Sequence, residues 1–272
     1  MFTLRQYLLA LLDSRGLTRT LGEIDVCRDE QGRPCFSAGN SAAVFRIRLG
    51  GRIRSLRCYL RPMRHLKEIY GQRLLEKELY LHTSPETGVW VDTVLGNWIE
   101  GSTLHETVAQ AAALRDRESL QILVRLFDRL ALALVTDDRA HGDLKPENII
   151  VGDDGTLCPI DFDASYLPAF AGEISPELGT AAYQHPARTA ADFDERIDDY
   201  PAALISTALH ALAEDPTLWD RYGSSDGLLY TPQRIASDPA YRETLALFEK
   251  RGMAVQYRIC LLYTSPSPRD RS

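Results

Sequence analysis

The spacing of hydrophobic residues divides the chain into a strand-rich first part and a helical second part. Residues 3–14 have an amphipathic helical pattern that closes at Gly16. From about residue 34, hydrophobic residues alternate with polar ones, as expected for antiparallel strands. These strands are predicted at 35–38, 44–49 and 52–60, with one or two more within 89–99. One helix interrupts them, which Pro62 opens and which runs to about Leu81.

Most hydrophobic segments of the second part have the helical period. Thr103 and Glu106 form a capping-box pattern at the start of a helix that ends near Leu114. A longer amphipathic helix follows from about Ser119 and leads to His141. A hairpin with its turn at 153–155 and three further helices complete this part, the helices at 200–212, 215–221 and 241–251.

Composition and charge exclude several classes of function. A net charge of −7 gives no support for broad attraction to nucleic acid or to anionic lipid. The apolar runs are too short to span a bilayer, and no basic region precedes a long apolar one at the N-terminus. The five cysteines are scattered without a C-x-x-C pair, which is typical of reduced thiols in the cytoplasm and makes zinc unexpected.

The last residues, 260–272, resemble a translated sequencing adapter rather than a natural C-terminus. They read Cys-Leu-Leu-Tyr-Thr-Ser-Pro-Ser-Pro-Arg-Asp-Arg-Ser. The alternative is an ordinary disordered tail rich in serine and proline. We therefore leave this segment out of the fold prediction, as one would a fusion scar.

One polar run gathers the groups that phosphoryl transfer needs. His141–Ile150 reads HGDLKPENII and places Asp143, Lys145 and Asn148 in one short loop. Thirteen residues after Asn148, Asp161 stands at the end of a second short apolar stretch. A carboxylate can accept a proton from an attacking hydroxyl, and a lysine can neutralise the transferring group. An asparagine and a second carboxylate can hold Mg²⁺.

These two runs resemble the catalytic loop H-R-D-x-K-P-x-N and the D-F-G motif of the protein kinase superfamily. The resemblance covers about residues 33–230 and is closest to compact bacterial Ser/Thr protein kinase-like domains. It implies an α+β, two-lobed protein kinase-like fold, with a small antiparallel β lobe that carries one main helix and a larger, mostly helical lobe. The implied domains are a helical extension at 1–32, the small lobe at 33–100 and the large lobe at 101–259.

The resemblance also implies an activity, namely ATP- and Mg²⁺-dependent transfer of the γ-phosphate to a Ser or Thr hydroxyl of a protein. It makes Asp143 the catalytic base, brings Lys145 to the γ-phosphate, and assigns the metal to Asn148 and Asp161. It gives His141 a structural role, packed and hydrogen-bonded under the loop. The residues that it implies for nucleotide binding are Gly39, Val44, Arg57, Asn97, Ile99 and Asp161.

The predicted nucleotide-binding segments depart from the family pattern. The glycine-rich motif falls on three small residues and a valine, at Ser37, Gly39, Ala42 and Val44. Arg57 stands where the family has a phosphate-binding lysine, and its planar fork is not equivalent to an ammonium group. The helix glutamate expected to pair with Arg57 is Glu76, with Glu68 and Glu78 as alternatives.

Later segments both support and modify the resemblance. Gly179–Pro186 resembles the motif G-T-x-x-Y-x-x-P, which shapes the peptide site, and Asp198 is expected to cap backbone donors beneath the catalytic loop. Gly142, Asp163 and Ala187 replace the Arg of H-R-D, the Gly of D-F-G and the Glu of A-P-E. Without an arginine at position 142, a phosphorylated activation loop has no evident cationic partner, so switching by phosphorylation is not expected.

Two other functions compete with the protein kinase hypothesis. The H-G-D and I-D-F-D runs are common in small-molecule kinases of the aminoglycoside and choline phosphotransferase type, whereas Lys145 and Gly179–Pro186 argue against them. A nucleotide-binding pseudokinase scaffold is the alternative that Arg57 and the single glycine of the phosphate loop suggest. The expected partner is a protein substrate, with neither nucleic acid nor membrane.

Overall fold

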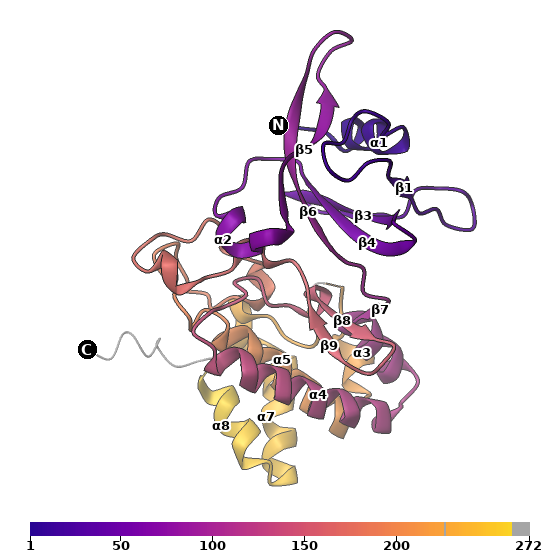
Figure 1. Ribbon diagram of the computed structural model, residues 1–272. Coiled ribbons are helices and arrows are strands. Elements are labelled where there is room, and N and C mark those ends of the chain that lie inside the picture. The colour runs from indigo at the N-terminus through magenta and orange to yellow at the C-terminus, as the bar shows by residue number, and fades with distance from the viewer. Residues whose placement is uncertain (226, 263–272) are drawn as a thin grey trace. The chain divides into compact units, whose positions relative to one another are not determined.

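The computed structural model describes residues 1–225 and 227–262 and divides the chain after Trp98 into two units (Figure 1). Each unit has its own cluster of buried hydrophobic side chains. Antiparallel strands and several helices make the fold α+β, as predicted. The described helices include none that is both long enough and apolar enough to cross a membrane.

Residues 1–98, all of them described, form an antiparallel sheet with strand order β1-β3-β4-β6-β5, and β2 pairs with β3. The helix α1 spans Leu4–Leu12. The strands are β1 Asp25–Val26, β2 Phe36–Ala38, β3 Ala42–Leu49, β4 Arg52–Tyr59, β5 Leu74–His82 and β6 Gly88–Asn97. The hairpins predicted from period-two alternation between residues 35 and 60 are therefore confirmed.

The core of this first unit lies between the sheet and α1. Phe45 and Ile47 alternate with more exposed neighbours along β3 and are completely buried, as expected for a strand with one covered face. Tyr7 and Leu11 of α1 are buried in the same cluster. The hydroxyl of Tyr7 donates a 2.6 Å hydrogen bond to the carbonyl oxygen of Tyr59. The predicted N-terminal extension is thus packed against the sheet.

The helix predicted from Pro62 to Leu81 is wrong. The helix α2 spans only Leu66–Tyr70, a 3-10 turn follows at Gly71–Arg73, and β5 occupies the rest. Gly71 has φ +53°, a left-handed conformation that ends the helix and favours glycine. In β5, Leu79 and Leu81 are both completely buried. This period of two is that of a strand, and it decides against the helix.

The second unit begins with a short antiparallel sheet and continues with packed helices. Its strands are β7 Gly101–Thr103, β8 Ile149–Gly152 and β9 Leu157–Pro159, in the order β7-β8-β9. Its α-helices are α3 Leu104–Ala113, α4 Arg117–Thr136, α5 Asp199–Glu214, α6 Leu218–Tyr222, α7 Pro239–Arg251 and α8 Ala254–Leu262. The predicted capping box is confirmed, because the Thr103 hydroxyl accepts from the Glu106 amide and the Glu106 carboxylate accepts from the Thr103 amide.

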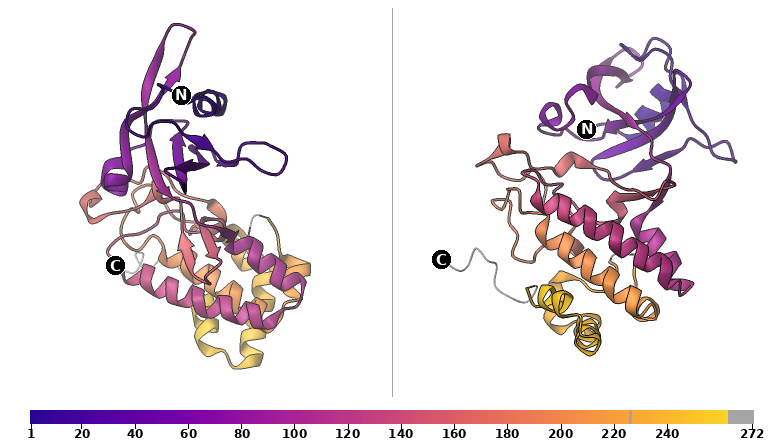
Figure 2. Two further views of the ribbon diagram at one scale, coloured as in Figure 1. Left: turned by 45° about the vertical axis from the view of Figure 1, so that its right-hand side comes forward. Right: turned by 60° about the horizontal axis from the view of Figure 1, so that its bottom comes forward.

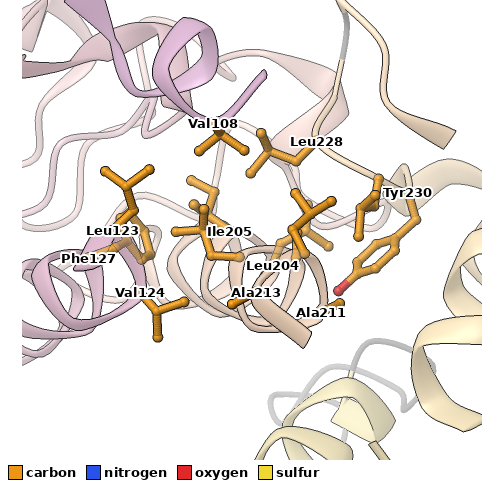
Figure 3. Packing of buried hydrophobic residues seen from close by; sticks show 14 of the residues in the cluster. Val108, Leu123, Val124, Phe127, Leu204, Ile205, Ala211, Ala213, Leu228 and Tyr230 are labelled. Atoms are coloured by element: carbon orange, nitrogen blue, oxygen red, sulfur yellow. The ribbon is translucent and has the colours of Figure 1, made fainter. Parts of the chain in front are cut away.

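The helices α4 and α5 lie side by side and form the centre of this unit (Figure 2). Figure 3 shows Leu123 and Phe127 of α4 in one buried cluster with Leu204 and Ile205 of α5. Burial of each such side chain stabilises the fold by roughly 1.5–3 kcal/mol. The segments that carry the predicted catalytic motifs connect these two packed helices along the chain.

The described chain ends in α8, which includes the first residues of the suspected adapter. Cys260 is completely buried, and its carbonyl oxygen accepts a 2.7 Å hydrogen bond from the Tyr241 hydroxyl. Residues 263–272 of that segment lie outside the described residues. Its adapter origin and the predicted domain boundaries stay predictions.

Candidate active site

The HGDLKPENII loop lies between α4 and β8 and is fixed at both ends. At its start, the backbones of Ala140 and Tyr166 exchange two hydrogen bonds of 3.1 and 2.9 Å. At its end, residues 146–148 form a 3-10 turn in which the Asn148 amide donates to the Lys145 carbonyl at 2.9 Å. The loop enters β8 directly from this turn, so the side chains between the two anchors have little freedom.

Asp198 supports the loop from below, as predicted. The amides of His141 and Gly142 both donate to its carboxylate, the second at 3.0 Å. Asp198 is only 1% exposed, so these hydrogen bonds are shielded from water. Burial raises the pKa of the Asp198 carboxyl, and the neighbouring His141 ring, the two amide donors and the Arg188 guanidinium oppose this rise.

His141 is structural, as predicted, and connects the loop with the second acidic motif. Its Nε2 lies 2.7 Å from the carbonyl oxygen of Ile160, and its Nδ1 accepts from the Asp143 amide at 3.3 Å. Both contacts are satisfied by the tautomer that carries a proton on Nε2 and none on Nδ1. The Ile160 amide donates to the Asn148 carbonyl at 2.8 Å. Both polar backbone groups of Ile160 are thus held, which fixes the start of Asp161.

The structure brings the three predicted catalytic side chains together. The Asp143 carboxylate accepts from the Asn148 side chain at 3.2 Å, and Lys145 Nζ lies 3.5 Å from Asp143 Oδ2. The other carboxylate oxygen accepts from the Thr180 amide at 2.5 Å. The Thr180 hydroxyl accepts from Lys145 Nζ at 2.8 Å. With 19% of its side chain exposed, Asp143 is held by three residues yet open to solvent.

Thr180 was absent from the predicted catalytic set, although it lies inside the G-T-x-x-Y-x-x-P motif. Its two contacts join residues 35 and 37 positions apart, a separation that local spacing does not encode. The signal that identifies it is the Gly-Thr pair itself. Gly179 has φ +73°, and a Cβ atom there would lie 2.7 Å from the Gly142 carbonyl oxygen and 2.9 Å from Asp143 Oδ1. The segment can approach the carboxylate because position 179 has no side chain.

We expect Gly179→Ala to lower the rate of the predicted phosphoryl transfer by about 10- to 100-fold, because the segment must move away from Asp143. Gly172→Ala is the matched control. Gly172 has φ +86° but nothing within 4 Å of an added Cβ, so its replacement imposes left-handed strain without a clash. Initial rates of both variants, measured at saturating ATP, check the expectation. Equal losses in the two would show that the clash with Asp143 does not matter.

Asn148 and Asp161, both in the second unit, carry the oxygen donors that Mg²⁺ prefers, and their role as metal ligands stays a prediction. The side-chain nitrogen of Asn148 donates to the Asp143 carbonyl at 2.9 Å and also to the Asp143 carboxylate. The side-chain oxygen of Asn148 therefore points away from Asp143 and can bind a cation. Asp161 has φ +67°, a left-handed conformation that is costly for a residue with a side chain and frequent at functional sites. The described residues contain no group of three or more His, Cys, Asp or Glu side chains placed to hold a metal. Mg²⁺ held mainly by phosphates and water needs no such cage.

In the first unit, the predicted phosphate-binding positions lie on neighbouring strands. Gly39 occupies the β2–β3 turn, where its amide donates to the Ala42 carbonyl at 2.9 Å. Val44 and Arg57 are directly opposite in the β3–β4 pair and so share one face of the sheet. The Arg57 guanidinium carbon lies 5.8 Å from the centre of the Tyr59 ring. The turn and the arginine are thus placed by two consecutive hairpins that share β3.

The two positions predicted to meet adenine fall on either side of the division between the units. The Asn97 carbonyl, at the end of β6, accepts from the Ser55 hydroxyl at 3.1 Å, and its side-chain oxygen accepts from Arg54. Ile99 is the first residue of the second unit. Their role in nucleotide binding stays a prediction.

The expected helix glutamate opposite Arg57 requires a correction, because Glu76 and Glu78 lie on β5 and not on a helix. Glu76 is exposed and pairs with Lys67 at 3.3 Å. Glu78 is 1% exposed, and its carboxylate accepts from the amides of residues 19–21 and from the Thr20 hydroxyl. These contacts bind the Glu78 carboxylate to residues 19–21, in the segment that follows α1. Glu68 lies on α2, and its pairing with Arg57 stays a prediction.

Known proteins share parts of this sequence. CBL-interacting protein kinase 17 of Oryza sativa subsp. japonica is 28% identical over 172 residues, which are 60% of this chain and 35% of the rice protein. The serine/threonine-protein kinase PknL of Mycobacterium tuberculosis is 34% identical over 113 residues, which are 39% of this chain and 27% of PknL. Each match thus covers about a third or less of the length of the relative. No family model matches the chain. The similarities support a relationship to the protein kinase-like superfamily.

Proposed function

We propose that the chain is an ATP- and Mg²⁺-dependent phosphotransferase of the protein kinase type that transfers the γ-phosphate to a Ser or Thr hydroxyl of a protein. The observation that carries this proposal is the cluster of Asp143, Lys145, Asn148 and Thr180 in one unit. The names of the similar proteins support phosphoryl transfer at the level of the superfamily. In this proposal, Asp143 orients the acceptor hydroxyl and takes its proton.

The neighbours of Asp143 have the other roles that phosphoryl transfer requires. Lys145 neutralises charge on the transferring phosphoryl group, and Asn148 with Asp161 holds the metal, which supplies further charge neutralisation when bound. Thr180 holds the side chains of Asp143 and Lys145 next to each other, because its amide donates to Asp143 and its hydroxyl accepts from Lys145. Gly39, Val44, Arg57, Asn97 and Ile99 remain the predicted nucleotide contacts.

The protein acceptor is favoured over a small molecule by the contact between the Gly179–Thr180 pair and Asp143. This pair belongs to a motif that in protein kinases shapes the peptide site, and here it touches the proposed base directly. We expect labelled γ-phosphate to appear on the protein itself or on a generic protein substrate. Label that appears only on aminoglycosides, choline or sugars would instead identify a small-molecule kinase.

A second candidate function is a nucleotide-binding scaffold without catalysis. Two features of the sequence favour it, namely Arg57 in the place of the phosphate-binding lysine and Gly39 as the single glycine of the phosphate loop. Such a protein would bind Mg²⁺-ATP but would transfer no phosphate. The transfer experiment therefore separates it from both enzymes.

Binding of Mg²⁺-ATP is expected to raise the melting temperature, because a ligand at about 100 times its Kd stabilises the folded state by about 2.7 kcal/mol. Asp161→Asn should remove most of this shift by weakening the metal site. Asp153→Asn, on the exposed turn between β8 and β9, makes the same chemical change away from the site and should leave the shift intact. A shift that survives Asp161→Asn would show that Asp161 does not hold the metal.

A further inference from the structure

Arg188 lies beside the catalytic loop and was not among the predicted site residues. Its Nη1 donates to the Gly142 carbonyl at 3.3 Å and to the Gln184 side-chain oxygen. One guanidinium nitrogen thus joins the loop that carries Asp143 to the segment that carries Thr180. Its Nε and Nη2 are shielded from solvent and have no hydrogen-bond partner in the described part of the chain. These two atoms form the other edge of the guanidinium and add no further anchor.

The surroundings of Arg188 are strongly acidic. Burial lowers the pKa of its guanidinium, and nearby carboxylates oppose that shift. The opposing carboxylates are Asp198, Asp143, Asp192 and Asp194. An arginine stays protonated in proteins, so a fixed positive charge stands among them. Asp198 accepts from two amides of the HGDLKPENII loop, and Asp143 of the same loop is the proposed base. The positive charge of Arg188 offsets the repulsion between these two carboxylates.

Position 142 cannot supply this charge. Gly142 has φ +82°, and a Cβ atom there would overlap the carbonyl oxygen of Ala164. No residue with a side chain fits without movement of the backbone. The missing arginine of the H-R-D pattern is therefore matched by a cation that arrives from a different segment, two residues after Pro186.

We infer that Arg188 is a positioning residue for the proposed base: its charge and its hydrogen bond to Gly142 hold the loop so that Asp143 stays aligned against Thr180. This inference rests on the proposed phosphotransferase function and adds to it a residue from the substrate-side segment. It also identifies a cation beside the loop, although position 142 carries no arginine. That cation is already engaged by the loop and by Gln184.

Two substitutions separate the charge of Arg188 from its hydrogen bonds. Arg188→Lys keeps the charge, whereas Arg188→Gln keeps a donor but removes the charge. We expect Arg188→Gln to lower kcat by about 20-fold or more, with the KM for ATP changed less than about twofold. Arg188→Lys should retain kcat within about fivefold. Arg196→Gln is the control, because Arg196 is exposed and pairs with Asp199 at 3.6 Å, and it should change neither parameter.

The thermal shift with Mg²⁺-ATP is recorded for each variant in the same experiment. Equal kcat values for the Lys and Gln variants, or a change confined to the KM for ATP, would overturn the assignment. If Arg188→Gln does not fold, Arg188→Lys decides, and a loss of kcat above about 20-fold would refute the role of the charge. A wild-type protein that transfers no phosphate would refute the proposed function, and the assignment with it. Active wild type with an equally active Arg188→Gln variant would refute the assignment alone.

Discussion

Replacement of Asp143 by asparagine is expected to lower kcat by about 10³-fold, within the range that general acid–base catalysis contributes. The substitution removes the proposed proton acceptor but keeps the shape of the side chain. An amide oxygen can still accept from the Thr180 amide, so the loop should remain in place. Steady-state rates with labelled ATP measure the loss, and the thermal shift with Mg²⁺-ATP should persist in the variant.

The control for this experiment is Asp153→Asn, which makes the same change on an exposed turn of the same unit. It should retain the wild-type rate. An Asp143→Asn variant that keeps more than about a tenth of wild-type kcat would rule out Asp143 as the base, since general-base catalysis contributes more than that. A variant that loses the nucleotide-induced shift would instead place Asp143 in nucleotide binding.

The largest expected effect on stability comes from Asp198→Ala. This change leaves the buried amides of His141 and Gly142 without their acceptor, and each unpaired buried group costs about 1–3 kcal/mol. A total of about 3 kcal/mol should lower the melting temperature of the second unit by roughly 6–12 °C. Scanning calorimetry measures the shift, and kcat should fall with it, because the same amides hold the catalytic loop.

Asp199→Ala is the neighbouring control for this prediction. Asp199 begins α5, its side chain is 45% exposed, and it pairs with Arg196. An exposed ion pair of this kind contributes about 0–1 kcal/mol. Similar losses of stability at positions 198 and 199 would show that the helix start, rather than the two amide bonds, accounts for the effect.

Local signals in the sequence were sufficient for much of the fold. The helix that begins at Thr103 follows from its capping residues, and the β8–β9 hairpin follows from the turn residues at 153–155. The failure at residues 62–81 has an equally local cause. Leu66, Ile69, Leu74 and Leu75 have a spacing compatible with one helix, and Gly71 between Ile69 and Leu74, with its positive φ, was not recognised as the end of α2.

The candidate site was predictable where its residues are close in sequence. Asp143, Lys145 and Asn148 fall within six positions, so a short loop brings them together. Thr180 and Arg188 reach the same loop from 35 to 46 positions away. Such contacts depend on how the segment after Asp161 returns across the loop, which hydrophobic periodicity does not specify. The Asp198 cap was inferred through the family resemblance rather than from its own neighbours.

Because Gly142 lies close to Ala164, the H-G-D loop and the I-D-F-D-A turn cannot be replaced independently of each other. A chimera that receives an H-R-D loop from a protein kinase would bring an arginine side chain against a carbonyl group of the I-D-F-D-A turn. The turn must therefore be transplanted with the loop. The residue that the donor protein has at the position of Arg188 must be transplanted as well. For protein engineers, residues 141–148, 161–165 and 179–188 form one module that cannot be redesigned piece by piece.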